Sequence, residues 1–264
     1  MTKSYKHIKT KINDLILSLR LNRIDKKNAL NHEMIGEIQN TLDLNANNPN
    51  VTVVLISSSC DVFCAGADLA YLEKIKTYNY EEQLNDSQQL MSLFKTMLTY
   101  PKLIISCVSG PAIAGGCGIV TASDISFATH ESKFGYPEVK IGFTPALVST
   151  FLMQKITEYK ARELLLTGRI IDGKEAHKIG LINYLCNQNE IENQVFNFIQ
   201  NFAKNTSPTS IKRTKEIMYY SLGLDAKLNR AAEINAKSRM EDDFKKGINA
   251  FLNKESINWK SKDV

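Results

Sequence analysis

The sequence predicts an α/β protein in which parallel strands alternate with helices and a helical region follows. Short apolar runs typical of strands alternate with longer helical patterns over the first half of the 264 residues. Repeated strand–helix–strand order implies parallel strands joined by crossover helices. Beyond about residue 145 the pattern is mostly helical.

The elements of the first half are bounded by turn and capping residues. Alternating apolar positions predict a strand over residues 14–21. Asn31 is predicted to cap an amphipathic helix that ends before residues 47–49. Residues 51–57 form the continuous apolar run of a buried strand.

The next segment repeats this order. A helical pattern over residues 81–100 ends at Pro101, which cannot continue a helix. Residues 103–108 predict another buried strand, followed by a glycine-rich turn and a short apolar segment over residues 119–122.

The C-terminal part reads as consecutive helices. Residues 191–202 carry an amphipathic stripe, Pro208 begins another helix, and helical patterns follow over residues 224–240 and 244–252. We therefore expect an α/β core over residues 1–200 and a helical region over residues 201–264.

Composition limits the class of protein. The chain is 43% hydrophobic, enough for a sizeable core, and no run approaches the roughly 18 apolar residues of a membrane span. The N-terminus lacks the apolar middle of a secretory signal, and five cysteines without paired spacing favour the reduced cytoplasm. The net charge of +5 is scattered, which fits either a solvated surface or an anionic ligand.

Two turns of small residues follow strand-type runs, at residues 63–69 and 109–118. Small residues let backbone N–H groups approach a ligand closely. Two such turns brought together could point two N–H donors at one oxygen, as in an oxyanion hole.

At these residues the chain resembles the crotonase, or enoyl-CoA hydratase/isomerase, superfamily. The resemblance covers nearly the whole chain and is closest to bacterial enoyl-CoA and methylglutaconyl-CoA hydratases. Five segments carry it, in the family's order: residues 21–31, 63–69, 110–124, 134–142 and, as the helix-turn that closes the core, 161–181.

The resemblance implies a crotonase-like spiral of ββα turns, with residues 201–264 as a trimerisation region and trimers or paired trimers as the assembly. It implies an acyl-CoA thioester substrate, with coenzyme A as part of the substrate, no tightly bound cofactor and no metal. By the match of positions, the N–H groups of Ala67 and Gly115 would hold the thioester oxygen, and Glu138 would be the acid/base.

The resemblance also places coenzyme A near Ala65, Asp68, Leu69, Phe251 and Lys254, the last two serving a neighbouring subunit. Other interpretations remain open for three of them. Asp68 is a good helix cap, Phe251 could belong to the core, and Lys254 could be a solvated lysine.

One expected carboxylate is missing. Gly118 stands where hydratases of the family usually carry the first of two glutamates, and Glu138 is the second. A single base fits moving a proton between two carbons better than adding water, which favours a Δ3,Δ2-enoyl-CoA isomerase. Overall resemblance favours a hydratase, so we expect hydration first and isomerisation as the alternative.

Several expectations follow from the missing carboxylate. Another residue should orient the water, and Glu73, Glu81 and Glu82 are the candidates. Restoring the glutamate by Gly118→Glu is expected to strengthen hydration. An apolar pocket of Phe134, Ile141 and Phe143 should raise the pKa of Glu138.

A non-catalytic protein that binds acyl-CoA or RNA is the rival from another class. The mildly basic charge keeps this possibility open, although a nucleic acid is an unlikely partner and no membrane contact is expected. Residues 115–118 lack the spacing of a dinucleotide-binding motif, and the cysteines and four histidines form no metal-like cluster.

Overall fold

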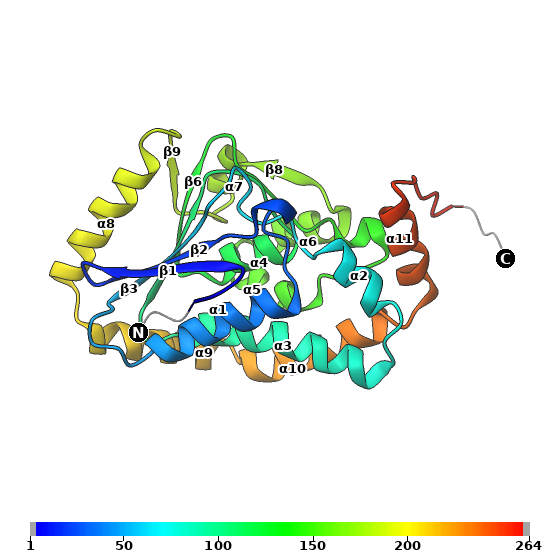
Figure 1. Ribbon diagram of the computed structural model, residues 1–264, viewed down its shortest axis with the longest axis horizontal. Helices are drawn as coiled ribbons and strands as arrows, with labels where there is room; N and C mark the ends of the chain where they lie inside the picture. Colours follow the sequence, from blue (N-terminus) through cyan, green and yellow to red (C-terminus); the bar gives the residue numbers. More distant parts are fainter. Residues whose placement is uncertain (1–3, 261–264) are drawn as a thin grey trace.

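A six-stranded sheet runs through the protein in the order β1-β2-β3-β4-β6-β9 (Figure 1). It is seen in a computed structural model that describes residues 4–260. Neighbouring strands are parallel except for the hairpin of β1 and β2. The strands are β1 (Ile8–Asn13), β2 (Ile16–Leu21), β3 (Val53–Ser58), β4 (Leu103–Val108), β6 (Ile125–Thr129) and β9 (Tyr184–Cys186).

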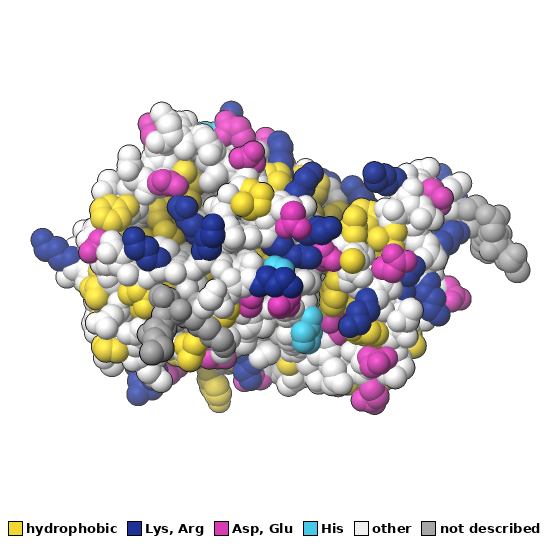
Figure 2. Space-filling view, viewed as in Figure 1, with side chains coloured by type: hydrophobic (Ala, Val, Ile, Leu, Met, Phe, Trp, Pro, Cys, Tyr) yellow, Lys and Arg dark blue, Asp and Glu magenta, His cyan; other side chains and the backbone are white. Residues whose placement is uncertain are grey.

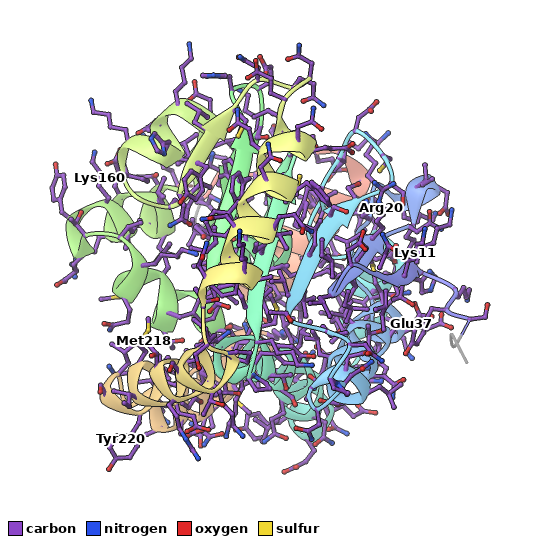
Figure 3. All side chains as sticks on the ribbon, turned by 90° about the vertical axis from the view of Figure 1, so that its left-hand side faces the viewer. Lys11, Arg20, Glu37, Lys160, Met218 and Tyr220 are labelled. Atoms are coloured by element: carbon purple, nitrogen blue, oxygen red, sulfur yellow. The ribbon has the colours of Figure 1, made fainter. Side chains whose placement is uncertain are left out.

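Helices cover both faces of this sheet, so its central strands β3, β4 and β6 are mainly apolar on both sides. On one face Leu103 and Ile105 of β4 pack with α8 (Ile191–Asn205), which crosses the strands in Figure 3. On the other face Ile104 and Val108 join the main core. This second face is covered by α1 (His32–Asn45), α3 (Tyr80–Thr99), α4 (Gly115–Ala122) and α5 (Ala146–Lys155).

A small second sheet holds the two segments of greatest interest side by side. Its strands are β5 (Ala112–Ile113), β7 (Lys133–Gly135) and β8 (Ile170–Asp172). Strands β5 and β7 are parallel, with Ala112 opposite Phe134. Because β5 leads into α4 and β7 leads into the 3-10 helix η2 (Pro137–Ile141), the pairing brings the starts of α4 and η2 together.

The C-terminal helices return to the core. Helix α10 (Leu224–Ser238) packs on α3 and α5, and α11 (Asp242–Asn253) packs on η2 and on α2 (Leu69–Ile75). The other helices are η1 (Ile24–Lys26), α6 (Glu158–Thr167), α7 (Gly173–Lys178) and α9 (Pro208–Ser221).

The predicted architecture is confirmed: mostly parallel strands with crossover helices, then a helical C-terminal part. The sequence patterns predicted β2, β3 and β4 but not β1, β5, β6, β7, β8 or β9. Only Ile8 of β1 is buried, because β1 is an edge strand whose other side chains face outward.

Two surface properties concern the whole molecule. On the face shown in Figure 2, Lys and Arg side chains are interspersed with Asp and Glu. Within residues 4–260, no helix has the length and apolar character needed to cross a membrane.

Candidate active site

The two small-residue turns are in direct contact. The Cys64 N–H donates to the Pro111 carbonyl (3.1 Å), and the Ile113 N–H donates to the Cys64 carbonyl (2.9 Å). A Cβ at Gly116 would lie 2.5 Å from the Cys64 Cβ, so only glycine lets the two turns come this close.

The first turn leaves the Ala67 N–H group unpaired. Leu30 N–H donates to the Gly66 carbonyl (2.7 Å) and Asp68 N–H donates to the Leu30 carbonyl (2.9 Å). These bonds hold the residues on either side of Ala67. In the described part of the chain the Ala67 N–H itself has no hydrogen-bond acceptor.

The second turn presents a helix N-terminus. Gly115 is the first residue of α4, whose first N–H groups have no partner within the helix. Ala114 precedes it with φ 51° and ψ −122°, a conformation that costs a non-glycine residue about 1–3 kcal/mol. This strained residue is held by its N–H bond to the Gly135 carbonyl (2.9 Å). No residue among 4–260 accepts from the Gly115 N–H.

Ala67, Gly115 and Glu138 line one cavity of about 380 Å³. Its walls are mainly apolar, and the positive end of the α4 dipole adds to the field at Gly115. The apolar lining includes Leu30, Leu72, Leu90, Phe94, Phe143 and Val148.

Glu138 is the buried carboxyl group of this cavity. It lies in the first turn of η2 and its side chain is only slightly exposed, with Oε2 unpartnered among the described residues. Burial raises its pKa to about 7, as expected from the sequence. A carboxyl group with this pKa can both accept and return a proton near neutral pH.

The position of the absent glutamate is occupied by an aromatic ring. Gly118 lies inside α4, and a Cβ there would be 2.7 Å from Cζ of Phe94 on α3. Phe94 is buried and packs edge-to-face on Phe151. The expectation that Gly118→Glu strengthens hydration therefore stays a prediction that requires the Phe94 ring to move, because the new side chain would have to displace it.

The three candidates for orienting water lie elsewhere. Glu73 is exposed beside Lys76, and Glu81 is exposed in the first turn of α3. Glu82 completes the capping box of α3 with Asn79. None of the three lines the cavity, so this expectation is wrong.

The cavity contains a second carboxylate that the sequence did not reveal. Asp86 of α3 accepts a hydrogen bond from Arg239 Nη1 (2.5 Å) and another from the Tyr71 hydroxyl. All three residues line the cavity. Asp86 and Arg239 are 153 residues apart, and no local pattern relates them.

The residues expected near coenzyme A divide into two groups. Ala65 and Phe251 line the cavity, Phe251 with a partly exposed ring. Leu69 and Lys254 are exposed outside the lining.

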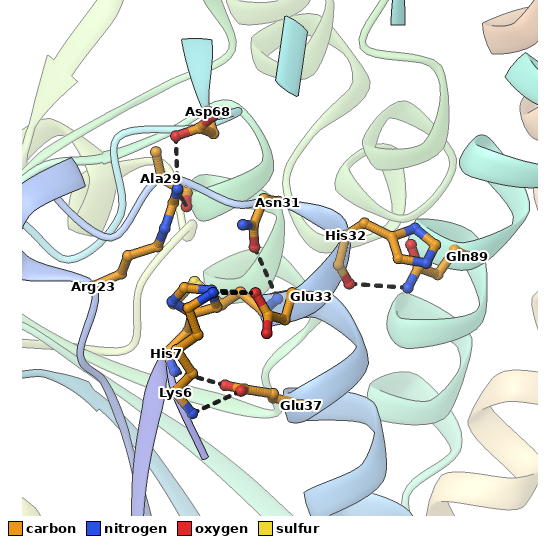
Figure 4. Close-up of polar contacts among 11 residues, drawn as sticks. Lys6, His7, Arg23, Ala29, Asn31, His32, Glu33, Glu37, Asp68 and Gln89 are labelled. Carbon is orange, nitrogen blue, oxygen red and sulfur yellow. Dashed lines mark hydrogen bonds and ion pairs between the residues drawn. The ribbon is translucent and has the colours of Figure 1, made fainter. Parts of the chain in front are cut away.

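Asp68 has a structural position. It caps α2 by accepting from the Tyr71 N–H (2.9 Å), and it pairs with Arg23 Nη1 (2.8 Å; Figure 4). Asn31 caps α1 by accepting from the Met34 N–H (2.9 Å). Together these contacts fix the Leu30 and Ala67 segments on the wall of the cavity.

The residues that the structure describes contain no group of three or more His, Cys, Asp or Glu able to hold a metal ion. The cavity presents two unpaired amides, one carboxyl group of raised pKa and a polar cluster.

Comparison with known proteins identifies similar chains. The family model described as enoyl-CoA hydratase/isomerase matches residues 11–262. A putative enoyl-CoA hydratase of Thermus thermophilus is 39% identical over 236 residues, covering 89% of this chain and 93% of the relative. Crotonyl-CoA hydratase of Syntrophomonas wolfei is 29% identical, covering 98% and 100%.

Solved structures are similar over the same extent. A putative enoyl-CoA hydratase/isomerase (crotonase) from Legionella pneumophila is 30% identical with a TM-score of 0.78, covering 97% of this chain and 100% of that one. A putative enoyl-CoA hydratase from Mycobacterium avium paratuberculosis is 27% identical with a TM-score of 0.85, covering 96% and 99%.

Proposed function

The chain belongs to the enoyl-CoA hydratase/isomerase family, and from this premise we propose that it hydrates a 2-enoyl-CoA thioester to a 3-hydroxyacyl-CoA. One observation supports the proposal above others. Two unpaired amides, from Ala67 and Gly115, and the unpartnered carboxyl group of Glu138 line the same apolar cavity.

In the proposed reaction the Ala67 and Gly115 N–H groups hold the thioester oxygen. Negative charge grows on this oxygen as the enolate forms, and the two amides stabilise it. The start of α4 contributes its positive dipole end at the same place. The loss of one such donor typically costs about 2.7–4 kcal/mol of transition-state stabilisation.

Glu138 performs both proton transfers in this proposal. Its carboxylate takes a proton from water while the water oxygen bonds to C3, and the C2–C3 π electrons move into the enolate. The neutral carboxyl group then returns the proton to C2, and the enolate electrons form the new C–H bond. One group with a pKa of about 7 suits both steps.

Isomerisation of a 3-enoyl-CoA is the second candidate, favoured by a specific observation. Residue 118 is glycine, so the acid/base position there has no carboxylate, and the Phe94 ring fills the space beside it. In this reaction Glu138 removes a proton from C2, the double bond moves into conjugation, and Glu138 returns the proton to C4.

Spectroscopy on the purified protein tests these candidates. With a 2-enoyl-CoA, hydration removes the absorbance of the conjugated thioester. With a 3-enoyl-CoA, isomerisation makes that absorbance appear. Loss of absorbance supports the first proposal, and its appearance alone supports the second. Binding of acyl-CoA without either change would make the protein a non-catalytic binder.

The lining of the cavity also supports a proposal for the contacts of coenzyme A. We propose that Ala65 and Phe251 contact the coenzyme A part of the substrate, since both line the cavity. Leu69 and Lys254 remain proposed contacts of coenzyme A in an assembled oligomer.

We further propose a trimer or a dimer of trimers, because apolar side chains are exposed on α9 and α6: Ile217, Met218, Tyr220, Tyr159 and Leu166.

A further inference from the structure

A polar cluster interrupts the apolar wall of the cavity. Arg239, at the end of α10, donates from Nη1 to Asp86 (2.5 Å) and to Gln83 (3.2 Å), and the Tyr71 hydroxyl donates to Asp86. Arg239 is only 4% exposed. Burying an ion pair is expensive and often adds little stability, so this cluster calls for a further role.

The cluster is also incompletely hydrogen-bonded. Arg239 Nε and Asn235 Oδ1 are buried without a partner among the described residues. Asn235 Nδ2 donates to the Thr144 carbonyl (3.0 Å), which fixes the amide so that the oxygen is the unpaired atom. Buried polar groups are nearly always paired, so this donor and this acceptor call for a bound water molecule or a ligand group between them.

These two atoms belong to one surface of the chain. Asn235 and Arg239 are four residues apart, so they share a face at the end of α10, and both line the cavity. The Arg239 guanidinium also lies over the Phe143 ring, 5.0 Å from its centroid.

The cluster lies away from the position of the absent glutamate. Asp86, Leu90 and Phe94 follow one another along α3 and all line the cavity. At 1.5 Å per residue, Asp86 is about 12 Å along the helix axis from Phe94, whose ring packs on Gly118. An acyl chain that extends from the reacting groups along α3 would reach the cluster, because both line the same cavity.

Charge decides which acyl group fits. Asp86 already balances the charge of Arg239, and Glu138 lines the same cavity. A carboxylate on the acyl chain would add an uncompensated buried charge, which is costly. A hydroxyl group is neutral, and it can accept from Arg239 while it donates to Asn235 Oδ1.

We propose that this end of the cavity recognises a hydroxyl group on the acyl chain, so that the protein prefers hydroxylated acyl-CoA thioesters over unsubstituted ones of equal length. The inference rests on the proposed function only in taking an acyl-CoA as the ligand.

Calorimetric binding of saturated thioesters tests the inference without requiring turnover. The probes are hexanoyl-CoA and octanoyl-CoA, their terminally hydroxylated counterparts, and the thioesters of equal length that end in a carboxylate. At one of the two lengths we expect the hydroxylated thioester to bind at least tenfold more tightly than the methyl-terminated one. Equal or weaker binding at both lengths overturns the inference, as does tightest binding of the carboxylate.

Variants test whether the cluster causes the preference. Asn235→Leu should reduce the ratio of the two dissociation constants to within about twofold of one, because the acceptor is gone. Asn229→Leu, at an exposed position of the same helix, is the matched control and should keep the ratio of the parent. An undiminished ratio in Asn235→Leu contradicts the assignment.

A second variant covers the case in which Asn235→Leu does not fold. The pair Asp86→Asn with Arg239→Gln removes both buried charges together, so neither is left unpaired. Its ratio should also approach one, and a ratio equal to that of the parent overturns the inference. Hydroxyl preference without turnover of any enoyl thioester would refute the proposed function and leave this inference standing.

Discussion

Glu138 carries an ionisable group in surroundings that disfavour its charge. It is buried in η2, and its pKa is raised to about 7 by burial. Perturbed carboxyl groups of this kind are common at catalytic positions. In the proposed mechanism this single residue supplies all of the proton transfer, which makes it the residue to test first.

Glu138→Gln should lower kcat/KM for the enoyl thioester by roughly 10²–10⁴, because the amide cannot exchange the proton. The dissociation constant of a saturated acyl-CoA should change little. Steady-state absorbance assays and calorimetry measure the two effects. Glu131→Gln, at an exposed glutamate, is the matched control. Turnover within a few-fold of the parent would remove Glu138 from the mechanism.

The pH dependence of kcat/KM should report the same group. The carboxylate is the reactive form in the proposed first step, so activity should fall about tenfold per pH unit below the pKa of about 7. Above pH 7 the rate should level off until another group titrates. A pH–rate profile from pH 5 to 9 measures this, and constant activity across that range would exclude Glu138 as the base.

The contribution of Glu138 to folding stability should depend on pH in the opposite direction to the activity. The folded-state pKa of Glu138, about 7, is above the ordinary value of 4.5. Its contribution to stability is therefore complete below pH 4.5 and is lost as the pH rises through 7. Between pH 4 and pH 8, the unfolding free energy of Glu138→Gln should gain about 3 kcal/mol relative to the parent. Denaturant unfolding at both values measures this, and a difference that does not change with pH would contradict it.

Helix α4 shows how one element combines close packing with function. Its glycines let it approach two neighbours, since Gly116 packs on Cys64 and Gly118 packs on Phe94. The first contact holds the two small-residue turns together, and the second closes the position of the absent carboxylate. The glycines of α4 thus allow the turns that carry the Ala67 and Gly115 amides to come together. They also leave the position of the first glutamate without a carboxylate.

Gly118→Glu alone should destabilise the protein by about 1–3 kcal/mol or more, because the new side chain overlaps the Phe94 ring. Thermal unfolding measures this loss. The double variant Phe94→Ala with Gly118→Glu opens space for the carboxylate, so its loss of stability should be smaller than the sum of the two single losses, and it should hydrate a 2-enoyl-CoA faster than Phe94→Ala alone. A single variant as stable as the parent would show that the ring moves freely.

The whole molecule brings distant segments to one cavity. Ala67 and Gly115 come from two turns of the α/β part, Glu138 comes from η2, and Arg239 comes from the C-terminal helices. Helix α10 packs on α3 and α5, so the C-terminal part completes the wall of the cavity from within the same chain.

The assembly prediction belongs to this scale. Exposed Met218 and Tyr220 point outward from α9 (Figure 3), and burying such side chains between subunits would be favourable. Light scattering with size-exclusion chromatography should give three or six chain masses. Met218→Glu with Tyr220→Glu should lower that number, whereas Lys11→Glu, at an exposed position of the edge strand β1, gives the comparison for charge alone. A monomeric parent would overturn the proposal.

The sequence by itself determined the elements and the family. Local periodicity and caps marked the three strands β2, β3 and β4 and the longest helices, because these signals act within a few residues. The two small-residue turns could be found because their small residues lie close together in the sequence. Glu138 could be found because it lies within a contiguous family motif. Strand β1 was not predicted because an edge strand carries few buried side chains, and β5, β7, β8 and β9 were not because each has only two or three residues.

Only the tertiary structure decided what surrounds the reacting groups. Three features depend on contacts between segments far apart in the chain. The Phe94 ring lies at Gly118, and Asp86 pairs with Arg239. The cavity is not lined by Glu73, Glu81 or Glu82. The sequence of a helix lists the residues of all its faces. Packing against other elements sets which of these faces lines a cavity. Tertiary packing therefore set which carboxylates line the cavity, namely Glu138 and Asp86.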